Sequence, residues 1–342
     1  MEKTKEILKD LCSAVSVSGH EHASAKALTE KYGGYFDNAY VDKFGNCVFV
    51  KKSELENAPR LLVDAHFDEV GMLVSSIEED GFLHISGVGG LDTRIFPAAE
   101  VTVYGKKEIY GVIASTPPHL QSEKTSKATP KMDNIIIDTG YTKEELSALV
   151  RVGDPVRLKG EFKELANGYV LSRALDDKAC VCAALISLMN ADKSKLAYDV
   201  YLTVSAQEET GRCGASFVAT DIKPDLAVII DVNFARCENV TEFESIECGG
   251  GAGIDISALT DRHLTKAIMK IAEQNGIEYQ TICEPDSTGT NNELVMISGT
   301  GVRTAVMSIP LMAMHTTSEA VCIKDVESLA DILRAIYVTK GL

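Results

Sequence analysis

The spacing of apolar positions changes its character twice along the chain. Apolar residues recur at helical spacing in 2–16 and 22–32, and continuous apolar runs at 45–50 and 60–66 predict strands. From about residue 72 to 165 the apolar runs become short, rich in β-branched residues and separated by turn residues. This middle pattern is typical of a small all-β domain such as a barrel.

From about residue 166 onward, segments of helical and strand character alternate. The predicted helices are 177–190, near 213–219, 262–275 and 325–338, and the predicted strands are 199–205, 226–232, 278–283 and 302–308. This alternation indicates an α/β fold, in which helices cover both faces of a central mixed sheet. Because the first 71 residues share this character, we predict one α/β domain of residues 1–71 plus 166–342, interrupted by an inserted barrel-like β-domain of residues 72–165. Inside the insertion, the polar, proline-flanked stretch 117–131 predicts a long exposed loop.

Composition narrows the classes of partner. The 342 residues carry a formal net charge of −16, which argues against binding nucleic acid or anionic membrane surfaces. The stretch Met1–Leu11 is polar and amphipathic, and no apolar run is long enough to span a bilayer. The nine cysteines form no C-x-x-C pair and lie mostly in apolar segments, as expected of buried, reduced thiols. We therefore expect a cytoplasmic protein.

Candidate metal ligands stand at the ends of predicted strands. One strand ends at His66 and is followed by Asp68, and a later one leads into Glu208 and Glu209. Asp231 ends the next apolar run. In open α/β sheets, ligands gather beyond the carboxyl ends of the strands, where adjacent carboxylates are costly to bury without a cation. Each motif alone also fits a structural histidine or a solvated loop, so the argument depends on the whole set.

Two further motifs complete a two-metal constellation. Asp176-Asp177 stands at a predicted helix start, where one carboxylate can bridge two ions while the other caps the helix. His315 follows the strand predicted at 302–308. Two divalent ions need a bridging carboxylate, about two further ligands each and a free base, and these residues supply them. The remaining histidines, expected at the surface or in structural roles, are His20, His22, His84, His119 and His263.

Taken together, these motifs resemble those of the tetrahedral (TET) aminopeptidase family, which includes bacterial glutamyl aminopeptidases and proteins labelled endoglucanase M. The matching stretches are Val17-Ser18-Gly19-His20-Glu21, Asp64-Ala65-His66-Phe67-Asp68-Glu69-Val70-Gly71, Gly111-Val112-Ile113-Ala114-Ser115, Pro117-Pro118-His119-Leu120, Val152-Gly153-Asp154-Pro155-Val156, Leu175-Asp176-Asp177-Lys178, Gln207-Glu208-Glu209, Gly211, Gly214-Ala215, Asp231-Val232, Ser308-Ile309-Pro310 and Met314-His315. They extend from residue 17 to about 320, so the resemblance covers nearly the whole chain.

The resemblance implies two divalent metal ions per chain. His66, Asp176 and Asp231 would hold one ion. Asp176, Glu209 and His315 would hold the other, with Asp176 bridging the two. Zinc is the expected metal, and cobalt or manganese also suit nitrogen and oxygen ligands of this kind.

The resemblance also implies an aminopeptidase that removes N-terminal residues from short peptides. Glu208 would be the general base, and Asp68 would orient His66. The ions would lower the pKa of a bridging water, and Glu208 would take its proton as the hydroxide attacks the scissile carbonyl. Because residues 72–165 contain none of these ligands, we expect them to serve assembly rather than chemistry. Homo-oligomers are typical of the family, often dodecamers shaped as hollow tetrahedra, and dimers also occur.

Three departures from the family pattern bear on the substrate. Asn291 stands where the family usually has Asp, Asn233-Phe234 replaces Thr-His, and Cys213 stands where Arg is common. The departure at Asn291 keeps hydrolysis of another small acylated substrate open as one alternative, and a non-catalytic assembly protein is another. Endoglucanase-like cleavage is a third, but it needs two carboxyls flanking a sugar without metal, and the histidine ligands argue against it.

Overall fold

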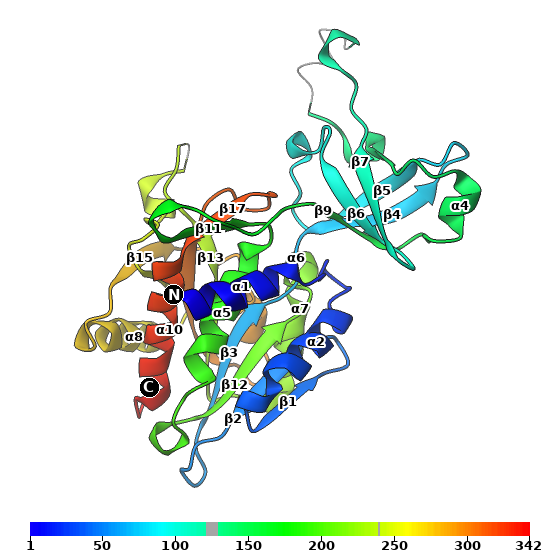
Figure 1. The fold of residues 1–342 in the computed structure, drawn as a ribbon. Coiled ribbons are helices and arrows are strands. Elements are labelled where there is room, and N and C mark those ends of the chain that lie inside the picture. Colours follow the sequence, from blue (N-terminus) through cyan, green and yellow to red (C-terminus); the bar gives the residue numbers. More distant parts are fainter. Residues whose placement is uncertain (121–128, 239) are drawn as a thin grey trace.

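One eight-stranded sheet and one closed barrel organise the chain, and the barrel stands apart at the upper right of Figure 1. The computed structural model describes residues 1–120, 129–238 and 240–342. In spatial order, the strands of the large sheet are β1 (Asn38–Val41), β2 (Cys47–Lys51), β12 (Asp199–Ser205), β3 (Arg60–His66), β13 (Leu226–Phe234), β16 (Arg303–Leu311), β14 (Ala252–Ser257) and β15 (Tyr279–Glu284).

The large sheet is mixed, as predicted. Its central strands β12, β3, β13 and β16 pair in parallel, whereas β2 pairs antiparallel with both β1 and β12. On the other side, β14 pairs antiparallel with β16 and parallel with β15. The carboxyl ends of the central strands therefore reach one edge of the sheet together, and that edge is where ligands bind in open α/β sheets.

Helices cover both faces of the sheet because its central strands bury side chains on both sides. Along β3, Leu61 and Val63 belong to one hydrophobic core and Leu62 to another. The first core includes residues of α1 (Glu2–Ser13), α2 (His22–Tyr32), α5 (Leu175–Leu188), α8 (Arg262–Gln274) and α10 (Ile323–Val338), and the second includes residues of α7 (Cys213–Ile222) and α9 (Asn292–Val295). The predicted arrangement of helices on both faces is thus confirmed.

The helix α5 lies at the centre of the first core. Of its 14 residues, all but Ile186 are buried, because α1, α10 and the sheet surround it. Helices that are apolar all round are buried in this way. The helix begins at Leu175, two residues before the predicted start, so Asp176 and Asp177 lie within its first turn. The carboxylates in its first turn therefore lie at the edge of the sheet where β3 ends with His66.

The residues between β3 and α5 include a closed antiparallel barrel with a core of its own. Its strands, in order around the barrel, are β4 (Gly71–Ile77), β5 (Leu83–Val88), β8 (Ile136–Asp138), β7 (Glu108–Ile113), β6 (Glu100–Tyr104) and β9 (Pro155–Leu158). Met72, Leu83, Val101 and Val156 are among the residues that fill its interior. The predicted barrel is confirmed, whereas the domain boundaries at residues 72 and 165 remain a prediction.

Short elements complete the fold. A three-stranded sheet of β10 (Lys163–Glu164), β11 (Tyr169–Ser172) and β17 (Glu319–Cys322) was not predicted from the sequence, and α4 (Lys143–Ser147) caps itself with Thr142 and Glu145. The loop predicted at 117–131 falls partly on residues 121–128, which lie outside the described residues. Within the described ranges, no helix combines the length and the apolar character needed to cross a bilayer.

The cysteines only partly follow the expectation of burial. All nine are free thiols, and five of them are buried. Cys237 and Cys283 are exposed, while Cys213 and Cys248 are half-buried.

Candidate active site

Three neighbouring parallel strands deliver the first residues of the site. The register pairs His66, at the end of β3, with Ser205, at the end of β12. Glu208 begins α6 (Glu208–Gly211) shortly after β12, and Asp231 lies near the end of β13. Because the strands are parallel, their carboxyl ends bring these side chains to one edge of the sheet.

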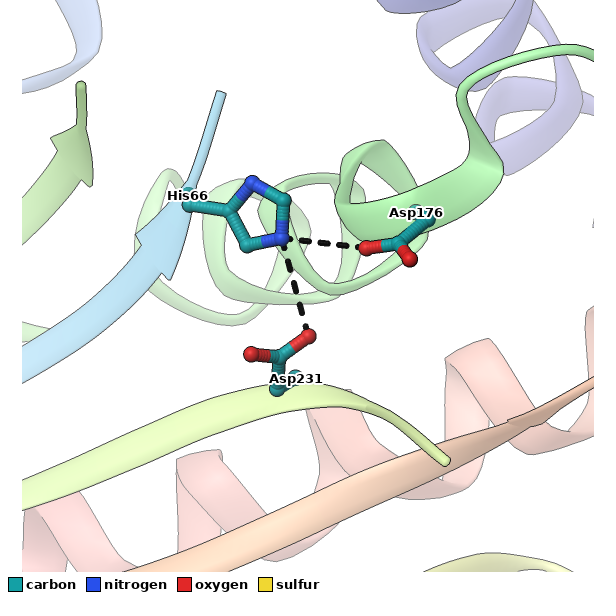
Figure 2. Close-up of side chains that lie close together, drawn as sticks. All are labelled: His66, Asp176 and Asp231. Atoms are coloured by element: carbon teal, nitrogen blue, oxygen red, sulfur yellow. Dashed lines mark hydrogen bonds and ion pairs between the residues drawn. The ribbon is translucent and has the colours of Figure 1, made fainter. Parts of the chain in front are cut away.

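The first group of candidate ligands consists of His66, Asp176 and Asp231 (Figure 2). Nε2 of His66 lies 3.0 Å from Oδ1 of Asp176 and 3.7 Å from Oδ1 of Asp231. All three side chains are buried. Burial alone would lower the pKa of His66, but the carboxylates of Asp176 and Asp68 raise it well above its usual value.

The second group shares Asp176 with the first and adds Glu209 and His315. Nε2 of His315 lies 3.2 Å from Oδ2 of Asp176 and 3.3 Å from Oε1 of Glu209. Burial would lower the pKa of His315, but these two carboxylates raise it to about 11. One oxygen of Asp176 therefore faces each imidazole, which is the geometry of a bridging carboxylate.

The two groups fit divalent metal ions in spacing and in chemistry. Within each group the candidate ligand atoms lie within 4.8 Å of one another, which suits atoms that each lie about 2 Å from a shared ion. Imidazole nitrogen and carboxylate oxygen suit zinc, cobalt and manganese, and three protein ligands leave an open position of the kind that catalytic sites keep. Among the described residues, none of the other five histidines joins either group, and His20, His22, His119 and His263 are exposed.

Glu208 and Glu209 are adjacent, yet their carboxylates have different surroundings. Glu209 faces His315, whereas an oxygen of Glu208 lies 3.3 Å from Nε of Arg212. Burial raises the pKa of Glu208 to about 7, which the positive charge of His66 opposes and the carboxylate of Glu209 reinforces. A carboxyl group with this pKa can both accept and release a proton near neutral pH.

Asp68 lies against His66, whose ring it is predicted to orient, and it has a second set of contacts. Its backbone oxygen lies 3.1 Å from Nδ1 of His66, closer than its carboxylate oxygen at 3.5 Å. The carboxylate also accepts hydrogen bonds of 3.0 Å from the backbone amides of both Glu208 and Glu209. A single residue therefore touches the imidazole of one candidate ligand and fixes the start of α6, which carries the two glutamates.

Glu319 is a functional candidate that the sequence did not reveal. Its buried carboxylate accepts hydrogen bonds from the backbone amides of Leu175, Asp176 and His315, over 2.7, 3.2 and 2.7 Å. It thus connects the backbone of two candidate ligands that are far apart in the sequence. Burial raises its pKa to about 8, and the neighbouring Asp176 contributes. In the sequence, the one feature that could have drawn attention to Glu319 is its position four residues after the candidate ligand His315.

The cap predicted for α5 is also different. Asp177 was expected to cap the helix, but its carboxylate accepts a hydrogen bond of 3.2 Å from the backbone amide of His66. The first amides of α5 are bound by Glu319 instead. The carboxylates of Asp176 and Asp177 therefore lie against His66 at the end of β3, and they do not cap the helix on which they stand.

The barrel reaches the site, although residues 72–165 supply no candidate ligand. The backbone oxygen of Gly90, just after β5, lies 2.7 Å from Nδ1 of His315. One carbonyl of the insertion therefore touches a candidate ligand, while the role of the insertion in the chemistry stays a prediction.

A cavity of about 810 Å³ opens over both ligand groups and Glu208. On its wall, Arg212 and Glu293 form an ion pair of 2.5 Å, and the side-chain amide of Asn233 donates a 2.8 Å hydrogen bond to Glu284. The volume is in the range of pockets for small substrates.

Only one of the three departures from the family pattern lines this cavity. Asn233 and Phe234 both face it. Asn291 does not, because its buried amide binds Asp64 and Ser205 beneath the site. The half-buried thiol of Cys213 instead bonds the backbone oxygen of Gly211.

Comparison with known proteins places these motifs in one family. The model of the M42 glutamyl aminopeptidase family matches residues 45–332. The lysyl aminopeptidase of Pyrococcus furiosus is 29% identical over 336 residues, which cover 97% of this chain and 96% of that protein. The structure of a TET aminopeptidase from a marine sediment archaeon of the Thaumarchaeota superposes with a TM-score of 0.93 at 27% identity, over 100% of this chain and 97% of that one. A TET peptidase of Pyrococcus horikoshii gives a TM-score of 0.86 at 31% identity, over 99% and 100% of the two chains. The chain therefore belongs to the M42 glutamyl aminopeptidase family and is a metal-dependent aminopeptidase.

Proposed function

We propose that the protein removes N-terminal residues from short peptides at a site built for two divalent ions. The observation that carries this proposal is the carboxylate of Asp176, whose two oxygens face the Nε2 atoms of two different histidines. A carboxylate placed between two ligand sets is what a pair of metal ions requires. His66 and Asp231 would complete the first set.

Glu209 and His315 would complete the second set. When bound, the ions would supply Lewis acidity, which lowers the pKa of a water molecule and polarises the scissile carbonyl. Zinc fits the mixture of imidazole and carboxylate ligands, and cobalt or manganese fits it as well.

We assign the general base to Glu208. Its carboxylate lines the cavity beside both ligand groups, and burial raises its pKa to about 7. It would take a proton from the attacking water and return it to the leaving amine. The bonds from the amides of Glu208 and Glu209 to Asp68 hold this base in place.

The barrel is our candidate for the surface through which copies of this chain assemble. It is closed, has its own core and supplies no candidate ligand, so its outer surface is free for contacts. The Pyrococcus horikoshii relative can assemble into a tetrahedron or a large octahedral shell. A comparable homo-oligomer, up to a dodecamer, would restrict this site to short peptides. The free thiols support a cytoplasmic location.

The alternative activities lose their support. Hydrolysis of another acylated substrate depended on Asn291, whose amide is buried away from the cavity. Glycoside cleavage would need two carboxyls free of metal, whereas Asp176 and Glu209 both face His315.

The test is to strip the protein with a chelator and restore it with zinc, cobalt or manganese. We expect two ions per chain by elemental analysis, and release of chromogenic product from a panel of aminoacyl substrates only in the restored protein. The Glu208→Gln variant is the control, since it keeps every candidate ligand. Full activity in the strictly metal-free protein would refute the proposal.

A further inference from the structure

Both candidate histidine ligands use the same ring nitrogen, Nδ1, to contact a backbone carbonyl. Nδ1 of His66 lies 3.1 Å from the backbone oxygen of Asp68, and Nδ1 of His315 lies 2.7 Å from the backbone oxygen of Gly90. A carbonyl can only accept a hydrogen bond, so each Nδ1 carries the proton. Nε2 is then the nitrogen that would bind a metal ion, once the ion displaces the proton that the facing carboxylates favour there.

The two carbonyls come from different parts of the fold. Asp68 is two residues from His66, whereas Gly90 belongs to the barrel and is 225 residues from His315. His66 is 2% exposed, so its neighbours also confine its ring, but the side chain of His315 is 26% exposed. The ring of His315 is therefore less confined by burial, and the bond to Gly90 carries more of the task of fixing it.

A side chain at position 90 would crowd the ring of His315. A Cβ atom on residue 90 would lie 3.1 Å from Nδ1 and 3.3 Å from Cε1 of His315. The preceding Gly89 has a φ of +76°, and a Cβ there would lie 2.8 Å from a side-chain carbon of Val70 and 3.4 Å from the Cβ of Glu209. The Gly89-Gly90 pair thus lets the barrel loop come close to two candidate ligands of the same ion.

We propose that Gly90 is a positioning residue for the second ion. Its carbonyl keeps the proton of His315 on Nδ1 and sets the angle of the ring, so that Nε2 faces Asp176 and Glu209, with which it would hold the ion. The inserted barrel thereby completes the metal site from outside the α/β body. This inference rests on the two-ion site proposed above.

The test is titration of chelator-stripped protein with zinc or cobalt ions, followed by calorimetry and by elemental analysis after dialysis. Gly90 does not have a positive φ, so Gly90→Ala adds a methyl group against His315 without straining the backbone. The backbone carbonyl remains, but the methyl group would push the ring away from it, and disturbing such an outer contact typically weakens metal binding by about 10–100-fold. We expect that loss for one ion only, because Asp68 still holds His66.

Two further variants separate the mechanism from a general disturbance. Gly87→Ala adds a methyl group in the same segment, where it meets the flexible end of Met132, and should bind both ions like the wild type. In a His315→Ala background, Gly90→Ala should have no further effect, because its only target is gone.

Each outcome decides the question. Wild-type binding of both ions by Gly90→Ala overturns the proposal, and so does equal loss of both ions or a further loss in the His315→Ala background. A wild-type protein that binds only one ion would instead remove the two-ion site itself. Failure of this inference and failure of the proposed function are therefore distinguishable.

Discussion

The side-chain amide of Asn291 donates a 2.8 Å hydrogen bond to the carboxylate of Asp64, and both residues are buried. Ser205 lies 3.0 Å from the same amide nitrogen. The amide therefore faces the interior beneath the strand that ends at His66 rather than the cavity. A carboxyl group at position 291 would stand against Asp64, where two adjacent carboxylates cannot both ionise at low cost.

We predict that Asn291→Asp changes stability but not substrate preference. One of the two buried carboxyl groups must stay protonated. The melting temperature of the variant should therefore fall further below that of the wild type as the pH rises from 5 to 8. Ratios of kcat/KM among aminoacyl substrates should stay as in the wild type, because position 291 does not line the cavity. Thermal unfolding at several pH values and the substrate panel measure the two effects.

Asn233→Thr is the matched comparison, because Asn233 lines the cavity and binds Glu284 over 2.8 Å. Loss of that amide frees the carboxylate, which should shift preference toward a basic N-terminal side chain by about tenfold. If Asn291→Asp shifted preference and Asn233→Thr did not, the assignment of the cavity wall would be wrong.

The adjacent glutamates should give different phenotypes. We predict that Glu208→Gln keeps both ions but lowers kcat by about 10²–10⁴-fold, which is the usual contribution of a general base. Glu209→Gln should instead weaken one ion, because Glu209 lies 3.3 Å from His315 in the second ligand group. Steady-state kinetics combined with elemental analysis distinguishes the two effects. Exchanged phenotypes would reverse the roles assigned to the pair.

A buried carboxyl outside the ligand groups predicts a pH-dependent stability. Burial, reinforced by Glu284, raises the pKa of Asp255 from 3.8 to about 7, and Ser308 donates a 2.8 Å hydrogen bond to it. Because the folded pKa is raised, the contribution of this group to stability is complete below about pH 3.8 and is lost as the pH rises to about 7.

Asp255→Asn removes that loss while keeping an oxygen that can accept the bond from Ser308. We therefore predict that its melting temperature exceeds that of the wild type by an amount that grows between pH 4 and 7 and then stays constant. Thermal unfolding across this range is the measurement, with the exposed Asp286→Asn as control. An advantage of Asp255→Asn that is the same at every pH would contradict the argument.

Sequence patterns pointed to the candidate ligands most clearly where these follow predicted strands. His66 ends β3 and Asp231 lies near the end of the parallel strand β13, and the apolar runs that lead to them predict that both lie near one edge of the sheet. The alternating runs also predicted the mixed sheet and the barrel. Short strands such as β1 and β14 were missed, because runs of four to six residues carry little periodicity.

Contacts between distant segments had no sequence signature. Glu319 binds the amide of Leu175 from 144 residues away, and Gly90 touches His315 through a backbone carbonyl that any residue possesses. The direction of the Asn291 side chain, toward the interior or toward the cavity, was also unpredictable. It depends on where the short helix α9 begins, and Asn291 directly precedes that helix. These residues became visible only once the folded chain brought the segments together.

The last prediction concerns assembly. The barrel exposes large apolar side chains outside its own core, among them Tyr110 at 54% and Val152 at 68%. Exposed apolar groups on a closed barrel are candidates for contacts between copies of the chain. We predict a homo-oligomer at low micromolar concentration, and we expect Tyr110→Lys combined with Val152→Lys to dissociate it, because unpaired charges are costly to bury. Light scattering after size exclusion measures both states.

Ile297→Lys is the matched control, since Ile297 is 66% exposed but belongs to the α/β body. It should leave the oligomer intact. The dissociated barrel variant should still bind metal and cleave short peptides, because the contact between Gly90 and His315 lies within one chain. It should also accept long unfolded polypeptides that a closed shell excludes. A wild-type monomer that cleaves short peptides at full rate would refute the assembly role of the barrel and leave the metal site untouched.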